Sequence, residues 1–212
     1  MQPMSSSPSG PVYRIQTLRL VLRCWDPKDA PMLKAAVDTS LDHLRPWMPW
    51  AGTEATDLAT QAGLLRRFRG EFDLEQDFVY GIFNADETLV VGGCGLHTRA
   101  GPKAREIGYW IRAGHTSQGL ATEAAAALTR VAFEVDEVSR VEIHCDPENV
   151  RSAAVARKLG FVHEATLRNR ARTAEGKLRD TMIWTLFSDE YPASPAASAE
   201  IEAFDVLGGK LL

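Results

Sequence analysis

Apolar and polar positions near the start of the chain follow first a strand period and then a helix period. Segment 18–23 places leucine at every second position with two arginines and a valine between, the spacing of a β-strand. Asp26 followed by Pro27 is typical of a helix start, because aspartate caps free N–H groups and proline fits the first turn. We expect a short helix from there through Val37. Residues 43–50 hold two prolines and two tryptophans and are expected to be irregular.

The middle of the chain alternates predicted helices and strands. Leucine and phenylalanine recur at helical spacing over 57–72, and an alanine-rich stretch over 119–135 has one apolar face. Shorter runs rich in β-branched and aromatic residues are expected to be strands. These expected strands are 78–84, 88–98, 105–111 and 141–145, and the first two form a hairpin.

The last third predicts one helix and a final hairpin. A helix over 152–159 is expected to end before Gly160, because glycine readily adopts the left-handed conformation that follows many helices. Two β-rich runs, 161–170 and 178–187, are expected to pair around Glu175-Gly176. Strands that alternate with helices, with hairpins among them, predict an α/β (α+β) fold built on a mixed sheet.

The length of 212 residues suits one domain with a substantial core. We expect a disordered segment over 1–11, a single domain over 12–191 and a loose tail over 192–212, because the two ends are rich in serine, proline and alanine. The first segment contains no apolar run of the kind found in a signal peptide or a membrane span. A cytoplasmic location is therefore the default expectation.

Composition narrows the class of protein. The chain is 45% apolar and 25% charged, which argues against disorder. Its net charge of -4 disfavours a broad nucleic-acid surface, although a local pocket for an anion stays possible. Cys24, Cys94 and Cys145 form no CxxC pair and are expected to be buried, reduced thiols, so no metal site is predicted.

One candidate for chemistry is the segment 116–124, between a predicted strand and a predicted helix. Glycine lets the backbone approach a ligand, and the first-turn N–H groups of a helix attract anions. Such a site suits a pyrophosphate, although most helix N-termini bind nothing. The segment is neither a P-loop nor a dinucleotide fingerprint. Glycines at 92, 93 and 95 lie inside a strand and are interpreted as bends or close packing.

A second candidate begins at Asn149 and Ser152. Taken separately, Asn149 is explained equally well as a helix cap and Ser152 as a first-turn serine. The pair becomes more specific because it follows a strand and precedes Lys158-Leu159-Gly160-Phe161.

Together these segments resemble the GNAT acetyltransferases, and the RimJ/RimL (ribosomal-protein N-terminal acetyltransferase-like) branch in particular. The resemblance runs from about Thr17 to Leu186. Thr116 stands where the family loop often has glutamine or arginine, and that position contributes mainly its backbone. The segments that carry the resemblance are Thr17–Arg23, Leu44–Trp50 (Leu-Arg-Pro-Trp-Met-Pro-Trp), Glu106–Ile111, Gly119–Ala124 and Asn149–Phe161.

The resemblance implies a mixed, mostly antiparallel sheet that is flanked by helices and splayed between its fourth and fifth strands. Acetyl-CoA is the implied cosubstrate, without a metal, and its pantetheine arm lies in the splay. The implied coenzyme A contacts are Tyr109, Trp110 and Ile111 along the pantetheine, the loop residues Thr116, Ser117, Gln118, Gly119, Leu120, Ala121 and Thr122 at the pyrophosphate, Asn149 on the pantetheine or near the acyl group, and Ser152 near the thioester sulfur.

The reaction needs a neutral amine, a polarised thioester carbonyl and a proton for the leaving thiolate. A backbone N–H near Trp110 and Ile111 is the candidate for the carbonyl, and Ser152 is the candidate proton donor. Glu106 is the first candidate base, directly or through water, with an exposed structural carboxylate as the equal alternative. His97 is the second candidate on the acceptor side.

Trp47 and Trp50 are expected to border the acceptor, or else to anchor an irregular loop to the core. An α-amine is roughly a tenth neutral at pH 7, whereas a lysine amine is about 0.04% neutral. A site without a strong base therefore favours a peptide or protein N-terminus. A small amine or antibiotic acceptor, or a non-catalytic coenzyme A-binding module, remains the alternative, and the protein is expected to be a monomer or homodimer.

Overall fold

In a computed structural model of the protein, residues 10–51, 56–173 and 176–212 are described. Within these residues, a nine-stranded sheet has the order β7-β8-β6-β5-β4-β3-β2-β1-β9. Its neighbouring strands pair antiparallel, apart from the parallel pair of β5 and β6. The strands are β1 (Arg14–Gln16), β2 (Leu20–Cys24), β3 (Phe78–Asn84), β4 (Val90–His97), β5 (Ala104–Ile111), β6 (Arg140–Cys145), β7 (Val162–Arg172), β8 (Leu178–Phe187) and β9 (Glu202–Phe204).

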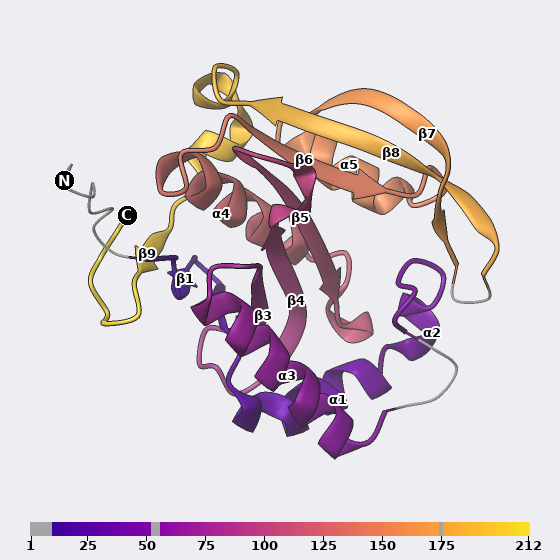
Figure 1. Cartoon of the computed structure of the whole chain (residues 1–212), viewed down its shortest axis with the longest axis vertical. Helices are drawn as coiled ribbons and strands as arrows, with labels where there is room; N and C mark the ends of the chain where they lie inside the picture. Colours follow the sequence, from indigo (N-terminus) through magenta and orange to yellow (C-terminus); the bar gives the residue numbers. More distant parts are fainter. Residues whose placement is uncertain (1–9, 52–55, 174–175) are drawn as a thin grey trace, which may run out of the picture.

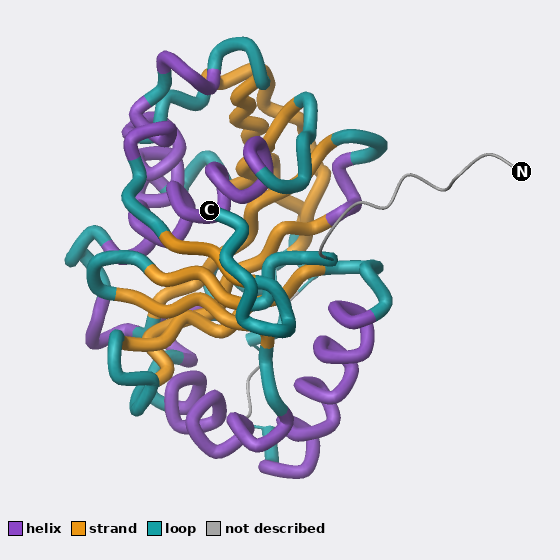
Figure 2. Tube along the Cα trace, turned by 90° about the vertical axis from the view of Figure 1, so that its left-hand side faces the viewer, coloured by secondary structure: helices purple, strands orange, loops and turns teal. Residues whose placement is uncertain are grey.

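Helices cover both faces of the sheet (Figure 2). The first three pack with or near the N-terminal strands, where Leu33 and Leu65 join Trp25 and Phe83 in one core cluster. The last two pack on the opposite face in a second cluster. The α-helices are α1 (Ala30–Asp38), α2 (Leu41–Leu44), α3 (Leu58–Asp73), α4 (Leu120–Glu134) and α5 (Val150–Lys158). These elements confirm the predicted mixed α/β fold.

The strand β2 is buried on both faces, and this corrects the expected boundary of the first strand. Leu20 and Leu22 belong to the cluster under α4, whereas Val21 belongs to the cluster under α1 and α3. Leu18 is 86% exposed and precedes the strand. The leucine spacing therefore predicted a strand correctly but placed its start two residues too early.

The sheet splays between β5 and β6. Ala104–Ile107 pairs with Arg140–Ile143, and beyond that point the described residues of the two strands have no shared register. Gly108–Ile111 continues to pair with β4 on its other edge. Figure 1 shows β5 and β6 diverging toward the side on which α2 lies. This is the predicted opening between the fourth and fifth strands of the family fold.

Local signals in the sequence set most of the helix ends. The side chain of Asp57 caps α3 by accepting from the Thr60 N–H at 2.6 Å. Gly160 follows α5 with a φ of 89°, the left-handed value that its position after a helix predicted. Residues 43–50 are less irregular than expected, because α2 includes His43 and Leu44 and the following residues form turns.

The segment 192–212 is ordered, so the expected loose tail is wrong. It forms 3-10 turns at Tyr191–Ala193 and Pro195–Ser198, and β9 then pairs with β1. Arg130 on α4 also donates to the carbonyl of Ala199 at 2.7 Å. Ala196 and Ala203 are fully buried in this segment. Composition alone did not predict this, because it carries no information about the pairing of β9 with β1.

The expected disordered segment 1–11 lies outside the described residues up to position 9. The predicted turn at Glu175-Gly176 also falls partly outside them, whereas the hairpin of β7 and β8 on either side is confirmed. In the described part of the chain, every helix is too short or too polar to cross a bilayer.

Candidate active site

A cleft of about 1420 Å³ runs through the splay in the sheet. The loop after α2, the helix α3, the strands β4 and β5, the N-terminus of α4, the end of β6 and the helix α5 all contribute to its lining. Every site residue predicted from the sequence lines this cleft except Gln118. The structure therefore brings together residues that are more than 100 positions apart.

The N-terminus of α4 opens into the cleft. Gly119 has a φ of 81° and Ser117 a φ of 62°, so the loop turns sharply through two left-handed residues before the helix begins. The first bond of the helix runs from the Glu123 N–H to the Gly119 carbonyl. The preceding N–H groups of the first turn are consequently available to an anion, as the sequence predicted.

Arg19 braces this loop from the start of β2. Its guanidinium donates to the carbonyl of Gln118 at 2.9 Å and pairs with Glu123 at 2.6 Å. The pairing neutralises the one acidic side chain in the first turn of α4, and an unpaired carboxylate there would repel an anionic ligand. Sequence analysis missed this role, because Arg19 and the loop lie about 100 residues apart.

Tyr109 and Ser152 are joined by a hydrogen bond across the cleft. The phenolic oxygen of Tyr109 lies 2.8 Å from Oγ of Ser152. Asn149 accepts from the Ser152 N–H at 3.1 Å, so its Oδ1 is the cap of α5. Asn149 therefore acts as a helix cap, one of its two predicted roles. Its Oδ1 is used in the cap, so its side-chain amide nitrogen is the group available to a ligand.

Burial keeps the titratable groups around Ser152 neutral. It raises the pKa of the Tyr109 phenol well above its ordinary value, and the hydrogen bond with Ser152 opposes that rise only partly. Burial likewise raises the pKa of the Cys145 thiol, which lines the cleft at the end of β6. A neutral phenol beside Ser152 can donate a proton, either directly or through the serine hydroxyl.

The open edge of β5 presents backbone groups to the cleft. The Arg112 N–H donates to the Val91 carbonyl on the side of β4. Backbone groups alternate in direction along a strand, so we infer that the N–H groups of Tyr109 and Ile111 point into the splay. For backbone groups of this edge, sequence analysis predicts contacts with the pantetheine arm and the thioester carbonyl.

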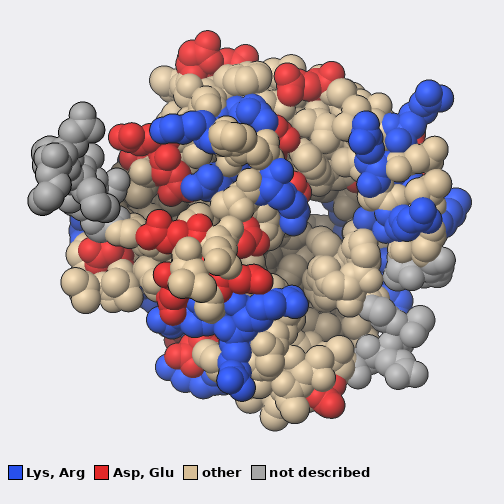
Figure 3. Space-filling model, in the orientation of Figure 1, with Lys and Arg blue, Asp and Glu red and all other residues tan. Residues whose placement is uncertain are grey.

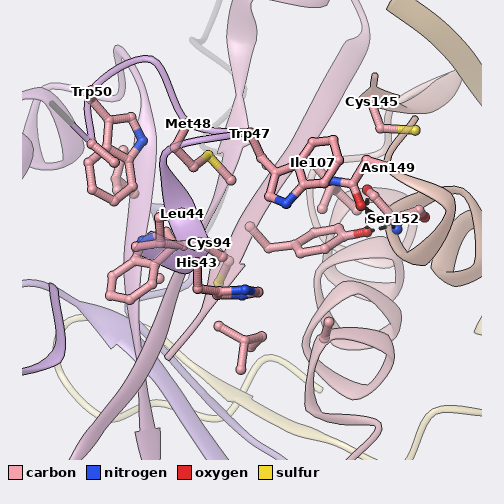
Figure 4. A pocket seen from close by; sticks show the side chains of 18 of the residues that line it. His43, Leu44, Trp47, Met48, Trp50, Cys94, Ile107, Cys145, Asn149 and Ser152 are labelled. Carbon is pink, nitrogen blue, oxygen red and sulfur yellow. Dashed lines mark hydrogen bonds between the residues drawn. The ribbon is translucent and has the colours of Figure 1, made fainter. Parts of the chain in front are cut away.

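Aromatic side chains from the loop after α2 line the acceptor half of the cleft, away from the N-terminus of α4. In Figure 4, Trp47 lies on the side of Ser152 and Asn149, whereas Trp50 lies at the far end. Trp50 packs edge-on against Trp110, with ring centroids 5.8 Å apart, and stays 52% exposed. Both predicted tryptophans therefore line the space opposite the open edge of β5.

The ring of His97 packs against two facing glycines at the floor of that space. Gly95 and Gly108 are register partners on β4 and β5, and a Cβ at Gly95 would meet His97 Nε2 at 2.8 Å. The strand glycines are thus explained by close packing, as expected. The other ring nitrogen, Nδ1, is hydrogen-bonded to Asp77 at 2.8 Å. Asp77 fixes the ring so that Nε2 faces the floor of the cleft.

Glu106 is held in a different way. Arg99 binds both carboxylate oxygens, at 2.8 and 2.6 Å, and the side chain of Glu106 is nearly buried. Burial opposes ionisation, but the Arg99 hydrogen bonds and the charges of His144, Arg99 and His97 lower the pKa of Glu106 overall. Its carboxylate is therefore a firmly ionised group that faces the acceptor half of the cleft.

Sequence analysis missed Asp77, Arg99 and His144 as parts of this polar floor. Asp77 pairs with His97, which lies twenty residues later, and such a contact leaves no sequence signal. His144 on β6 lies 3.5 Å from Glu106 on the neighbouring strand β5, and 2.7 Å from Glu142 on its own strand. Only the parallel pairing of β5 and β6 brings these groups together.

The fold, the splay and the helix N-terminus define an acetyltransferase of the GNAT class. Residues 19–162 match the family model described as an acetyltransferase (GNAT) domain. The chain belongs to this family, as the sequence resemblance predicted.

Curated relatives and solved structures share the class. The chain is 25% identical over 186 residues to the [ribosomal protein uS5]-alanine N-acetyltransferase of Escherichia coli, covering 85% of this chain and 94% of that one. It is 33% identical over 113 residues to an uncharacterised N-acetyltransferase, p20, of Bacillus licheniformis, a match that spans 53% of this chain and 63% of p20. The structure of Mycobacterium smegmatis RimJ in complex with CoA-disulfide superposes with a TM-score of 0.75 at 25% identity, covering 89% and 91% of the two chains.

Proposed function

We propose that this protein transfers the acetyl group of acetyl-CoA to the α-amino group of a peptide or protein N-terminus. The observation that carries the proposal is the through-cleft, which joins the N-terminus of α4 to an aromatic-walled space with a polar floor. A bound thioester and an incoming amine can enter this cleft from its two halves and meet beside Ser152. The relative from Escherichia coli is named for acetylating the alanine of a ribosomal protein.

The donor half of the cleft fits acetyl-CoA. The first-turn N–H groups of α4 suit the pyrophosphate, and the open edge of β5 suits the amides of the pantetheine arm. The N–H of Tyr109 or Ile111 is placed to stabilise negative charge on the thioester oxygen during attack. Tyr109 and Ser152 together supply the proton to the departing thiolate.

The acceptor half assigns different roles to the two candidate bases. Glu106 is ionised and bound by Arg99, so its contribution is an electrostatic one: it favours a positively charged ammonium on entry. His97 is the stronger candidate for taking the proton, because Asp77 orients the ring and leaves Nε2 toward the floor. Proton transfer through water to His97 accounts for turnover in a site where Arg99 holds the carboxylate of Glu106.

The acceptor class is tested with a panel of amines. Short peptides with free N-termini, polyamines, amino acids and aminoglycosides are offered with acetyl-CoA, and released coenzyme A thiol is measured. We expect turnover with the peptides and a mass increase of one acetyl group on their first residue. Activity confined to polyamines or aminoglycosides would support the small-amine alternative, and binding of acetyl-CoA without any turnover would support the non-catalytic one. The monomer or homodimer and the cytoplasmic location remain predictions.

A further inference from the structure

The hairpin of β7 and β8 is basic, although the chain as a whole has a net charge of -4. Of the 13 residues from Leu167 to Arg179, five are arginine or lysine and one is acidic. Figure 3 shows these cationic side chains gathered at the edge of the molecule where the hairpin lies in Figure 1. We call Arg168, Arg170, Arg172 and Lys177 the basic arm; all four are exposed.

Most of the basic arm is free to bind a partner. Within the described residues, the side chains of Arg168, Arg170 and Lys177 have no ion pair and no hydrogen bond, while Arg172 donates to the Gly176 carbonyl at 2.8 Å. Other exposed arginines, such as Arg99, are committed to carboxylates. A single unpaired surface cation is ordinary, but several that are grouped on one hairpin create a local positive potential.

A bulge fixes the direction of the arm. Leu167 pairs with Thr181 and Ala171 with Arg179, so β7 has two more residues than β8 between these positions. Asn169 lies at the centre of the bulge with a φ of 56°, and its N–H donates to Asp180 at 3.0 Å. The bulge interrupts strand pairing at Arg168 and Arg170, a device that often re-aims side chains.

The base of the arm is tied to the acceptor side of the cleft. Arg179 lines the cleft and donates to the carbonyls of Pro46 at 3.1 Å and Trp47 at 2.9 Å. Its guanidinium also lies 3.6 Å from Asp146 at the end of β6. Figure 1 shows the hairpin reaching past the sheet toward α2. The basic arm therefore stands next to the loop that carries Trp47.

We propose that the basic arm binds acidic side chains that follow the N-terminus of the acceptor polypeptide. The inference rests on the proposed function, because a polypeptide whose first amine enters the cleft must continue outward past its rim. Unpaired arginines there suit carboxylates, which guanidinium groups bind through paired hydrogen bonds. Residues 167–179 contain no aromatic side chain on which a nucleotide base could stack, so a polypeptide is favoured over single-stranded RNA.

The test compares two acceptor peptides that share their first three residues and continue with either acidic or neutral polar residues. The variant is Arg168→Glu/Arg170→Glu. The control is Arg66→Glu, which reverses an exposed charge on α3 that does not line the cleft. Turnover is followed by thiol release at low and high salt. Affinity is measured separately by anisotropy with labelled peptides of both kinds whose N-termini are blocked, so that this arm of the test needs no chemistry.

The proposal predicts a kcat/KM for the acidic peptide about 5-fold or more above that for the neutral one at low salt, with the difference lost at high salt. The double variant should lose the preference while keeping its rate on the neutral peptide, and Arg66→Glu should keep both. In anisotropy, the blocked acidic peptide should bind more tightly than the blocked neutral one, and the double variant should lose this difference. This result does not require that any peptide is a substrate. A labelled short single-stranded RNA is included in the anisotropy series. Equal affinities for acidic and neutral peptides would overturn the proposal, as would a double variant that loses only binding to the RNA.

Discussion

The phenolic oxygen of Tyr109 lies 2.8 Å from Oγ of Ser152, and this hydrogen bond joins the open edge of β5 to the first turn of α5. It crosses the cleft at the point where the sheet splays. Two hydroxyls in one bond make a short path along which a proton can move toward a leaving thiolate. Ser152 alone was the candidate from sequence, and the structure adds Tyr109 as its partner.

If the two hydroxyls act as one unit, removing either should cost about as much as removing both. We expect Tyr109→Phe and Ser152→Ala each to lower kcat by about 100-fold, with little change in the affinity for acetyl-CoA. The double variant should lose little more. Thiol-release kinetics measure all three, and fully additive losses would show that the two residues act independently.

Substitution of each residue separates the two candidate bases. The pKa of Glu106 is lowered, so its carboxylate is ionised throughout the neutral and mildly acidic range. Glu106→Gln should therefore reduce kcat/KM by a similar factor between about pH 6 and pH 9. His97→Gln should instead remove most of the rate, because the proposed proton acceptor is lost. A pH profile in which Glu106→Gln removes the acid limb would return the role of base to Glu106.

Binding of acetyl-CoA should depend on the left-handed turn at Gly119. An alanine there is strained at a φ of 81°, at a cost of about 1–2 kcal/mol, so Gly119→Ala should weaken binding by about 10-fold. Gly114→Ala is the matched control, because an added Cβ meets open space there and no left-handed φ is involved. Calorimetry provides the two dissociation constants. Equal weakening by both substitutions would contradict the assigned loop.

The ionised carboxylate of Asp77, at the floor of the acceptor half of the cleft, is expected to stabilise the folded protein. Burial opposes its ionisation, but the hydrogen bond and charge of His97, the Thr98 N–H and the charge of Arg99 lower its pKa overall. A depressed carboxyl pKa stabilises the fold above the unfolded-state value near 4, and that contribution is lost as pH falls through the lower folded-state pKa. Asp77→Asn should therefore reduce the free energy of unfolding by about 1–2 kcal/mol at pH 6 to 7. The difference should shrink in urea titrations toward pH 3, and a constant difference across that range would contradict the linkage.

Sequence predicted the elements that build the donor half of the site, because their signals are local. The turn at Gly119 and the cap at Asn149 each depend on residues within a few positions. Leu18 shows the limit of periodicity: its spacing fits the strand, yet the chain has not entered the sheet there.

The acceptor floor could not be derived from sequence, since tertiary pairing creates it. The hydrogen bond with Asp77 orients His97, and the hydrogen bonds from Arg99 hold the carboxylate of Glu106 in place. The strand in the C-terminal segment was not predicted for a related reason. Ala203 and its neighbours form a strand because they pair with the edge of β1. Short elements that depend on a distant partner leave little pattern in the chain itself.

The central claim is that the acceptor is an α-amine, and direct competition tests it. A peptide with a free N-terminus and no lysine is offered together with the same sequence carrying a blocked N-terminus and one lysine, and both products are quantified by mass spectrometry. The α-amine is easier to deprotonate by about 3 kcal/mol. The two carboxylates beside His97 do not offset that difference, because Asp77 is bonded to the imidazole ring and Glu106 to Arg99. We expect acetylation of the free N-terminus to dominate by at least about 100-fold. Equal rates, or preference for the lysine peptide, would contradict the account.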